Sequence, residues 1–91
     1  MVSCNTHFLK IQPIWFEDVK SGKKNFEIRQ NDRNFAVGDI LVLQEYDHGQ
    51  YTGREIQKEI EYIYHGDGYY GLAEGFCVLG IKDGKTIQRD N

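Results

Sequence analysis

Basic and acidic side chains gather in one short stretch of the chain. From Gly22 to Arg33 the sequence reads GKKNFEIRQNDR, with four basic and two acidic residues in twelve. Lys24 and Arg29 are the best candidates for contacts with an anion, because lysine carries a compact charge and arginine a planar fork of donors that fits phosphate. A carboxylate at Glu27 can accept hydrogen bonds from the exocyclic amine of an unpaired cytosine. The stretch therefore predicts a polar site for a phosphate-bearing or base-like ligand.

The same spacing has a second interpretation. Glu27 could pair with Lys24 or Arg29 in a surface ion-pair cluster that binds nothing, and exposed pairs of this kind contribute little to stability. The candidate nucleic-acid contacts are Lys10, Lys23, Lys24, Glu27, Arg29 and Arg33.

A strand preceded by a helix must position these side chains. Residues 25–29 alternate, with Phe26 and Ile28 on one face and Glu27 and Arg29 on the other, which predicts a half-buried strand whose apolar face joins the core. A short helix over residues 12–21 precedes it, with an apolar stripe of Ile14, Phe16 and Val19. Proline suits its first turn, and Gly22 suits a left-handed residue at its end.

The rest of the chain predicts a small β-rich domain. We expect further strands over residues 6–11, 40–46, 54–64 and 76–81, and polar loops over 47–53 and 65–75, with one helical turn near 72–74. Alternating β-branched and aromatic residues favour strand over helix for 54–64. The order is β-α-β-β-β-β, an α+β and mostly β fold. Five strands of this size should curl into a small mixed barrel, with the single helix packed on it.

Turn residues separate these elements. Asp32 favours a turn after the charged stretch because its side chain bonds the local backbone, while Gly38 and Asp39 predict a tight turn before the strand over 40–46. Together with Gly22, these residues are expected to be structural.

Three aromatic residues are candidates for stacking on a base. Trp15 lies in the predicted helix, where a place in the core is the alternative. Tyr69 and Tyr70 lie in a glycine-rich loop, where no strand face would bury them. Aromatic stacking is a recurrent way to hold unpaired bases, so residues 65–75 are predicted to form a lid over the site.

Length and charge bound the class of ligand. The 91 residues form one domain, with its core over about 6–82. The net charge is -3, but residues 1–33 hold six basic and four acidic side chains against five and ten in residues 34–91. This balance argues against tight duplex binding, which relies on many phosphate contacts, and leaves a small or single-stranded ligand. The acidic second half would suit a protein partner.

The sequence predicts no membrane span, metal site or cofactor. No apolar run reaches the length of a membrane span, so no membrane partner is predicted, and without a signal-like N-terminus the default location is cytoplasmic. The two cysteines and three histidines lack metal-ligand spacing, so we predict reduced thiols, no metal and no cofactor.

The motif resembles the signature of a known family. Gly22-x-Lys24-x-x-Glu27-x-Arg29, with Val37-Gly38-Asp39 downstream, is similar to the signature of the ASCH domain (activating signal cointegrator homology) of the PUA-like superfamily. The resemblance covers nearly the whole chain. Asn31-Asp32-Arg33 and Leu43-x-Glu45-Tyr46 resemble an uncharacterised bacterial and phage-associated branch. The resemblance to the ASCH domain implies a PUA-like barrel with a cleft beside the signature, and an RNA or nucleotide-like ligand.

One branch of that family is enzymatic, and this supplies an alternative. Its members hydrolyse the acyl amide of N4-acetylcytidine with a catalytic lysine at the position of Lys24, together with a threonine and a glutamate; here Glu27 stands where that threonine would be. If the chain is an enzyme, Lys24 would act as base or nucleophile and Glu27 or Glu74 would transfer the proton. We favour a non-enzymatic binding module. A protein-interaction module is the second alternative, and the sequence indicates neither the ligand nor the oligomeric state.

Overall fold

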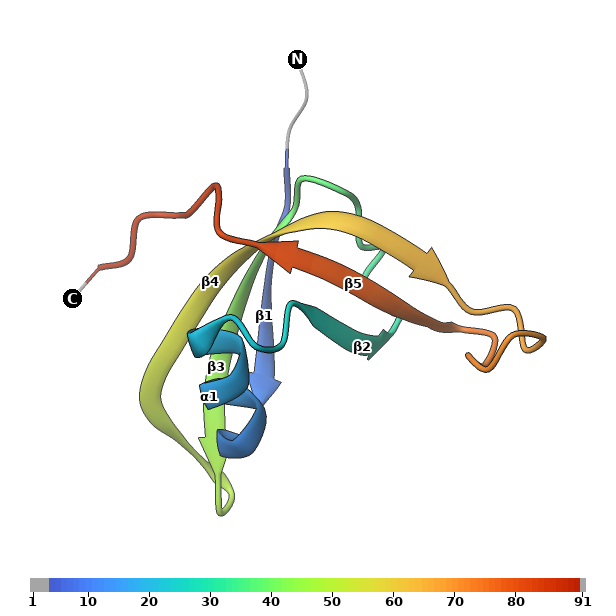
Figure 1. Ribbon diagram of the computed structural model, residues 1–91. Coiled ribbons are helices and arrows are strands. Elements are labelled where there is room, and N and C mark those ends of the chain that lie inside the picture. The colour runs from blue at the N-terminus through green and yellow to red at the C-terminus, as the bar shows by residue number, and fades with distance from the viewer. Residues whose placement is uncertain (1–3, 91) are drawn as a thin grey trace.

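The chain forms one curled sheet with a single helix. The computed structural model describes residues 4–90 (Figure 1). Its elements are β1 (Thr6–Ile11), α1 (Pro13–Ser21), β2 (Phe26–Gln30), β3 (Ile40–Asp47), β4 (Gln50–His65) and β5 (Phe76–Lys82). All five strands belong to one sheet in the order β1-β3-β4-β5-β2, with β1 and β3 parallel and the other neighbours antiparallel. The predicted mostly β fold with one helix after the first strand is confirmed.

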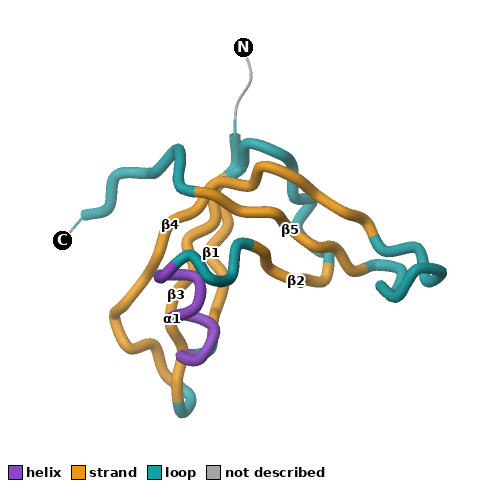
Figure 2. Tube along the Cα trace, in the orientation of Figure 1, coloured by secondary structure: helices purple, strands orange, loops and turns teal. Residues whose placement is uncertain are grey.

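The sheet bends into a half-barrel that leaves β1 and β2 as its two edges. Figure 2 shows β1, β3 and part of β4 descending on one side, while β5 and β2 extend to the other. The helix α1 packs against β3 and buries Phe16 and Val19. The core lies inside the bend. It consists of Leu9, Ile11, Phe16, Val19, Phe35, Leu41, Leu43, Ile60, Cys77, Leu79 and Ile81.

The helix and its exit turn follow the sequence closely. Pro13 opens α1, and Gly22 ends it in the left-handed conformation with φ 85°. Gly38 also has positive φ. Asp39 fastens the next turn, because its carboxylate accepts bonds from the Asn5 and Ala36 backbone N–H groups and from His7 Nε2. The apolar stripe of α1 is narrower than predicted, since Ile14 is exposed.

The two faces of β2 are the reverse of the prediction. Glu27 is 4% exposed, whereas Phe26 and Ile28 are 39% and 55% exposed. The register with β5 explains this, because Glu27 pairs with Leu79 and thus shares the inner face of that buried residue. Alternation separates two faces of a strand but does not say which one is inside. At this edge strand Glu27 can lie on the inner face because Lys24 and Arg29 pair with its carboxylate there.

The hairpin between β3 and β4 is tighter than predicted. The expected loop over 47–53 is wrong, since only His48 and Gly49 separate the strands. Both have positive φ, at 50° and 82°, as a type I′ turn requires. The flanking polar residues look loop-like in the sequence because the hairpin tip is exposed on both faces. By contrast β4 is strand throughout, which confirms strand over helix for 54–64.

Two remaining segments are irregular. The loop over 66–75 contains no helical turn, contrary to the expectation near 72–74. The tail after β5 runs along β4 without becoming a strand: Ile87 exchanges hydrogen bonds with the Gln57 side chain, and Arg89 pairs with Glu55. Within residues 4–90, no helix has the length and apolar character needed to cross a membrane.

Candidate functional site

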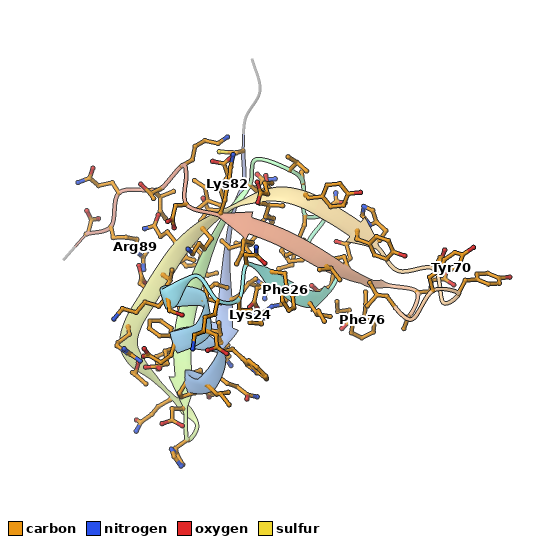
Figure 3. All side chains as sticks on the ribbon, in the orientation of Figure 1. Lys24, Phe26, Tyr70, Phe76, Lys82 and Arg89 are labelled. Atoms are coloured by element: carbon orange, nitrogen blue, oxygen red, sulfur yellow. The ribbon has the colours of Figure 1, made fainter. Side chains whose placement is uncertain are left out.

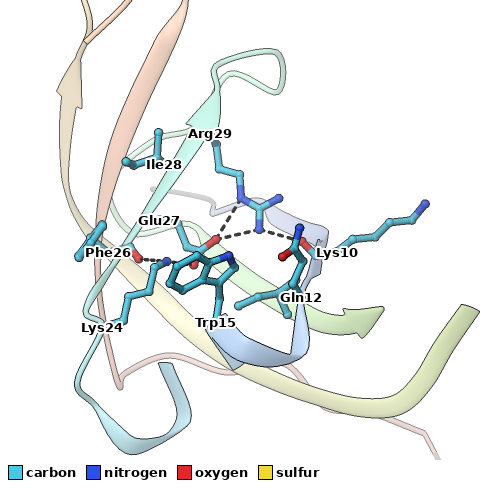
Figure 4. Close-up of a pocket in the computed structure, with 9 residues that line it drawn as sticks. Lys10, Gln12, Trp15, Lys24, Phe26, Glu27, Ile28 and Arg29 are labelled. Atoms are coloured by element: carbon cyan, nitrogen blue, oxygen red, sulfur yellow. Dashed lines mark hydrogen bonds and ion pairs between the residues drawn. The ribbon is translucent and has the colours of Figure 1, made fainter. Parts of the chain in front are cut away.

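A hollow opens where the half-barrel fails to close. It has a volume of about 450 Å³ and lies between the end of β1, the start of α1 and the edge strand β2 (Figure 4). This volume lies in the range of pockets that bind small molecules. We call this hollow the signature pocket. Its lining residues are Lys10, Ile11, Gln12, Trp15, Lys24, Phe26, Glu27, Ile28 and Arg29.

The local fold brings the charged motif into this pocket. The left-handed Gly22 reverses the chain after α1, and the Lys24 N–H donates to the Asp18 carbonyl at 3.0 Å. This bond holds the connection against the helix and places Lys24 beside the start of β2. Within β2, the period of two then directs Glu27 and Arg29 to the inner face.

Glu27 forms the centre of an ion-paired trio. Its Oε1 accepts a bond from Lys24 Nζ, and its Oε2 accepts bonds from Arg29 Nε and Nη2 at 3.1 and 2.8 Å. Arg29 Nη2 also donates to the Lys10 carbonyl of β1, at 2.8 Å. The pairing foreseen in the surface-cluster interpretation is therefore present. The trio does not decorate an open surface, however, because Glu27 is buried beneath the pocket.

Donors remain available in the pocket after this pairing. Lys24 Nζ donates to Glu27 and, at 2.8 Å, to the Phe26 carbonyl, which uses two of its three N–H groups. Arg29 Nη1 makes no hydrogen bond to any of residues 4–90. The trio carries one net positive charge. The floor of the pocket is thus suited to acceptor oxygens such as ring carbonyls or phosphate.

The walls are aromatic and aliphatic. Trp15 of α1 and Phe26 of β2 are both partly exposed at the pocket. Lys24 Nζ lies 5.8 and 4.9 Å from their ring centroids, within cation–π distance of each. Trp15 was predicted either to stack on a base or to join the core, and the structure places it in the pocket wall.

Arg33 and Lys10 lie beside the trio. Arg33 lines a second hollow of about 150 Å³, which shares Arg29 with the signature pocket. Arg33 Nη1 donates to the Phe8 carbonyl at 2.9 Å. Two arginine side chains therefore bridge the open edges of the sheet, since Arg29 reaches the backbone of β1 in the same way. Lys10 meets the trio through its backbone carbonyl, while its side chain points away from the pocket, with the ammonium 4.2 Å from the Tyr46 ring centroid (Figure 4).

Other predicted site residues are not brought to the pocket. Tyr69, Tyr70 and Glu74 belong to the β4–β5 loop, at the far end of the sheet from Lys24 (Figure 3). The expected lid over the site is therefore corrected, because the long β4–β5 ribbon carries this loop away from α1. Glu74 is also removed as a proton-transfer group for this pocket. Lys23 is exposed and does not line it.

A charge cluster missed from the sequence links the β3–β4 hairpin to the helix that carries Trp15. The buried Glu45 accepts bonds from Arg54 Nε and Nη2 and from the Thr52 hydroxyl. Hydrogen bonds from Arg54 and then Thr52 lower the pKa of Glu45 to about 2. Arg54 also pairs with Glu17 of α1, at 2.6 Å. Arg54 lies nine residues from Glu45, across the β3–β4 hairpin, and 37 residues from Glu17. The loop expected over residues 47–53 concealed the hairpin pairing, and no local signal points to Glu17.

Among residues 4–90, no three His, Cys, Asp or Glu side chains come together as metal ligands. Cys4 and Cys77 are both free thiols, and Cys77 is buried. Burial, followed by the nearby Asp32 charge, raises the pKa of the Cys77 thiol.

Comparison with known proteins places most of the chain in one family. Residues 6–81 match the sequence model of a family described as a domain of unknown function (DUF3850). An uncharacterised 12.9 kDa protein from the GpA 3′ region of Escherichia phage P2 is 41% identical over 54 residues. That alignment covers 59% of this chain and 50% of the phage protein, so the chain spans about half the length of the curated relative it matches.

Proposed function

The chain belongs to the DUF3850 family, and we propose that it binds an unpaired base of RNA, or a nucleotide, in the signature pocket. One observation carries the proposal. The carboxylate of Glu27 is buried between Lys24 and Arg29, at the floor of a hollow with Trp15 and Phe26 in its walls. A charged trio kept at the base of an apolar-walled hollow is costly to desolvate, which favours a role in binding over a purely structural one.

The geometry suits the two parts of a nucleotide. The faces of Trp15 and Phe26 can stack on a base, an interaction that every base offers. The remaining N–H groups of Lys24 and Arg29 can donate to ring carbonyl or phosphate oxygens. Gln12 adds an amide that both donates and accepts, and so can read a base edge.

The proposal extends to kinship with the ASCH domains. The signature residues Gly22, Lys24, Glu27 and Arg29 act together in the fold: the glycine turns the chain, and the three charged residues meet in one pocket. The curled mixed sheet, with one helix after the first strand, supports a PUA-like assignment. The ligand class implied by that resemblance agrees with the chemistry of the pocket.

The single tryptophan makes the proposal directly testable. Trp15 is the only tryptophan in the chain and lines the pocket, so a base that stacks there should quench its fluorescence. We expect ribonucleoside monophosphates or short unpaired RNAs to quench it in a saturable way. Lys24→Ala should weaken the binding, whereas Lys23→Ala should not, because the neighbouring lysine is exposed outside the pocket.

Two results would count against the proposal. One is the absence of quenching, and of NMR shifts at pocket residues, for all four monophosphates and for short RNAs. The other is an equal effect of Lys23→Ala and Lys24→Ala, which would indicate non-specific attraction to the basic stretch. Circular dichroism of both variants controls for loss of the fold.

A second candidate function is hydrolysis of an acylated cytidine. The direct contact between Lys24 Nζ and the Glu27 carboxylate favours it, because such a pair can relay a proton to and from a reacting amide. Water would add to the acyl carbon, and the C–N bond would then break with protonation of the departing amine. Release of acetate from N4-acetylcytidine, abolished in Lys24→Ala, would establish this activity. Binding without release would leave the chain a binding module.

A further inference from the structure

The outer surface of β2, β5 and β4 exposes an unusual number of large apolar side chains. We call this surface the outer aromatic face. It comprises Phe26 and Ile28 of β2, Phe76 and Val78 of β5, and Tyr62 and Tyr64 of β4. All except the half-buried Val78 are exposed. Contiguous exposed apolar surface of this kind commonly marks a place where another molecule binds.

Strand register shows that these side chains form one surface. Val78 pairs with Tyr64 on one side and with Ile28 on the other, and Gly80 pairs with Tyr62 and with Phe26. Directly paired residues point to the same face of a sheet, so two rows cross all three strands. Phe76 extends the surface toward the β4–β5 loop, as Figure 3 shows.

Gly80 leaves the middle of the outer aromatic face without a side chain. At Gly80, an added Cβ would lie 3.3 Å from the Tyr62 Cβ, so a larger residue would press on the tyrosine. Adjacent strands lie about 4.8 Å apart, which puts Tyr62 and Phe26 roughly 10 Å from each other across this glycine. The face therefore offers aromatic rings separated by a position without a side chain, an arrangement that suits successive planar bases.

The face is continuous with the signature pocket. Phe26 and Ile28 belong to both, and Lys24 Nζ lies 4.9 Å from the Phe26 ring centroid. The other outward positions of β2 and β5 add Gln30 and Lys82, and on β4 the carboxylate of Glu59 lies on this face, because Glu59 pairs with Lys82. Lys24 therefore supplies the positive charge at the end of the face that meets the pocket, where a phosphate of the strand would lie. A second copy bound to this face would instead cover a wall of the pocket.

We infer that the outer aromatic face binds the unpaired bases that continue from the nucleotide in the pocket. The ligand class is then a single-stranded nucleic acid of several nucleotides rather than a free nucleotide. This inference rests on the proposed function, because the pocket supplies the first contact and sets where the strand begins. Stacking recognises bases of RNA and DNA alike, so the test must separate the two sources.

The experiment compares a mononucleotide with an oligonucleotide. Binding of fluorescein-labelled octamers, as RNA and as DNA of the same sequence, is followed by anisotropy, and uridine monophosphate binding by Trp15 fluorescence. The test variant is the double substitution Tyr62→Thr with Tyr64→Thr, which keeps strand-forming residues. The control is Tyr51→Thr, because Tyr51 is an exposed tyrosine of β4 that lies at the β3–β4 hairpin, outside the outer aromatic face.

The expected result is selective. The octamer should bind more tightly than the mononucleotide. In the double variant, the affinity for the octamer should fall roughly tenfold or more for each stacked ring that is lost. Mononucleotide quenching should be unchanged in the double variant, and Tyr51→Thr should alter neither. Tighter binding of the RNA octamer would identify RNA as the ligand. Tighter binding of the DNA octamer would identify DNA.

The other outcomes overturn the inference in distinguishable ways. If the mononucleotide binds but the octamer binds no more tightly, or the double variant leaves octamer binding intact, the face is not a nucleic-acid surface and the pocket proposal stands. If neither ligand binds, both proposals fall. If the double variant abolishes a dimer seen by sedimentation without changing octamer affinity, the occupant of the face is a second copy of the chain.

Discussion

The substitution Glu27→Gln separates a buried charge centre from a surface cluster. It keeps the shape of the side chain and removes its negative charge. In the folded protein the Glu27 side chain is 5% exposed, and its partners Lys24 and Arg29 are 16% and 23% exposed. The substitution therefore leaves two cations close together with their shared counter-charge removed.

The expected cost follows from this burial. Removing one partner of a buried ion pair typically costs about 3–5 kcal/mol, and the access of both cations to water through the pocket favours the lower end, about 3 kcal/mol. A domain of this length has a free energy of unfolding of roughly 5–14 kcal/mol. The midpoint of thermal unfolding should then fall by roughly 12–24 °C.

Thermal and urea unfolding at pH 7, followed by circular dichroism, measure this loss. Glu74→Gln is the matched control, because Glu74 is exposed and its substitution should change stability by less than about 0.5 kcal/mol. Added inorganic phosphate should raise the midpoint of Glu27→Gln more than that of the unsubstituted protein, since an anion can replace the lost charge. A midpoint within about 2 °C of the unsubstituted protein would refute the reasoning, because a cost that small is typical of solvated surface pairs.

Three further predictions concern the rest of the fold. Because the pKa of folded Glu45 is about 2, against an ordinary value of 4.5, its contribution to stability is complete above pH 4.5 and lost as the pH falls toward 2. The stability difference between the unsubstituted protein and Glu45→Gln should shrink over that range in urea unfolding; a constant difference would contradict the assignment. Gly66→Ala should destabilise by about 1–3 kcal/mol, since its Cβ would lie 2.1 Å from the Ala73 carbonyl oxygen; an unchanged unfolding midpoint would refute that contact. Alkylation of the native protein should consume Cys4 and spare the buried Cys77 until denaturant is added, and rapid labelling of both thiols would show that β5 opens easily.

Much of the local structure could be predicted from residue types. Pro13 and Gly22 define the two ends of α1 because one has a fixed φ and the other adopts positive φ freely. The strand assignment of β4 followed from β-branched and aromatic residues at alternate positions, even though its charged residues favour a helix. Such signals act within a few residues, so they can be interpreted before the tertiary structure is known.

The candidate site was predicted in part. Lys24, Glu27 and Arg29 were chosen from their types and spacing, and the fold brings them together with Trp15. Gln12 was missed, because an amide at the start of a helix carries no signal until the opposite wall is known. Conversely, the tyrosine pair of the β4–β5 loop was expected at the pocket and lies elsewhere, since loop composition does not reveal where a ribbon ends in space.

By itself, the sequence determined the period of the strands, the turns at Gly22 and Gly38 and the chemical character of the charged stretch. Only the tertiary structure decided which face of β2 lies inside, because that depends on pairing Glu27 with Leu79 of β5, more than fifty residues later. It also decided that the sheet stays open between β1 and β2, where Arg29 reaches the Lys10 carbonyl across the gap. Long-range register sets both outcomes, since a strand pairs with distant partners whose identity no local pattern encodes.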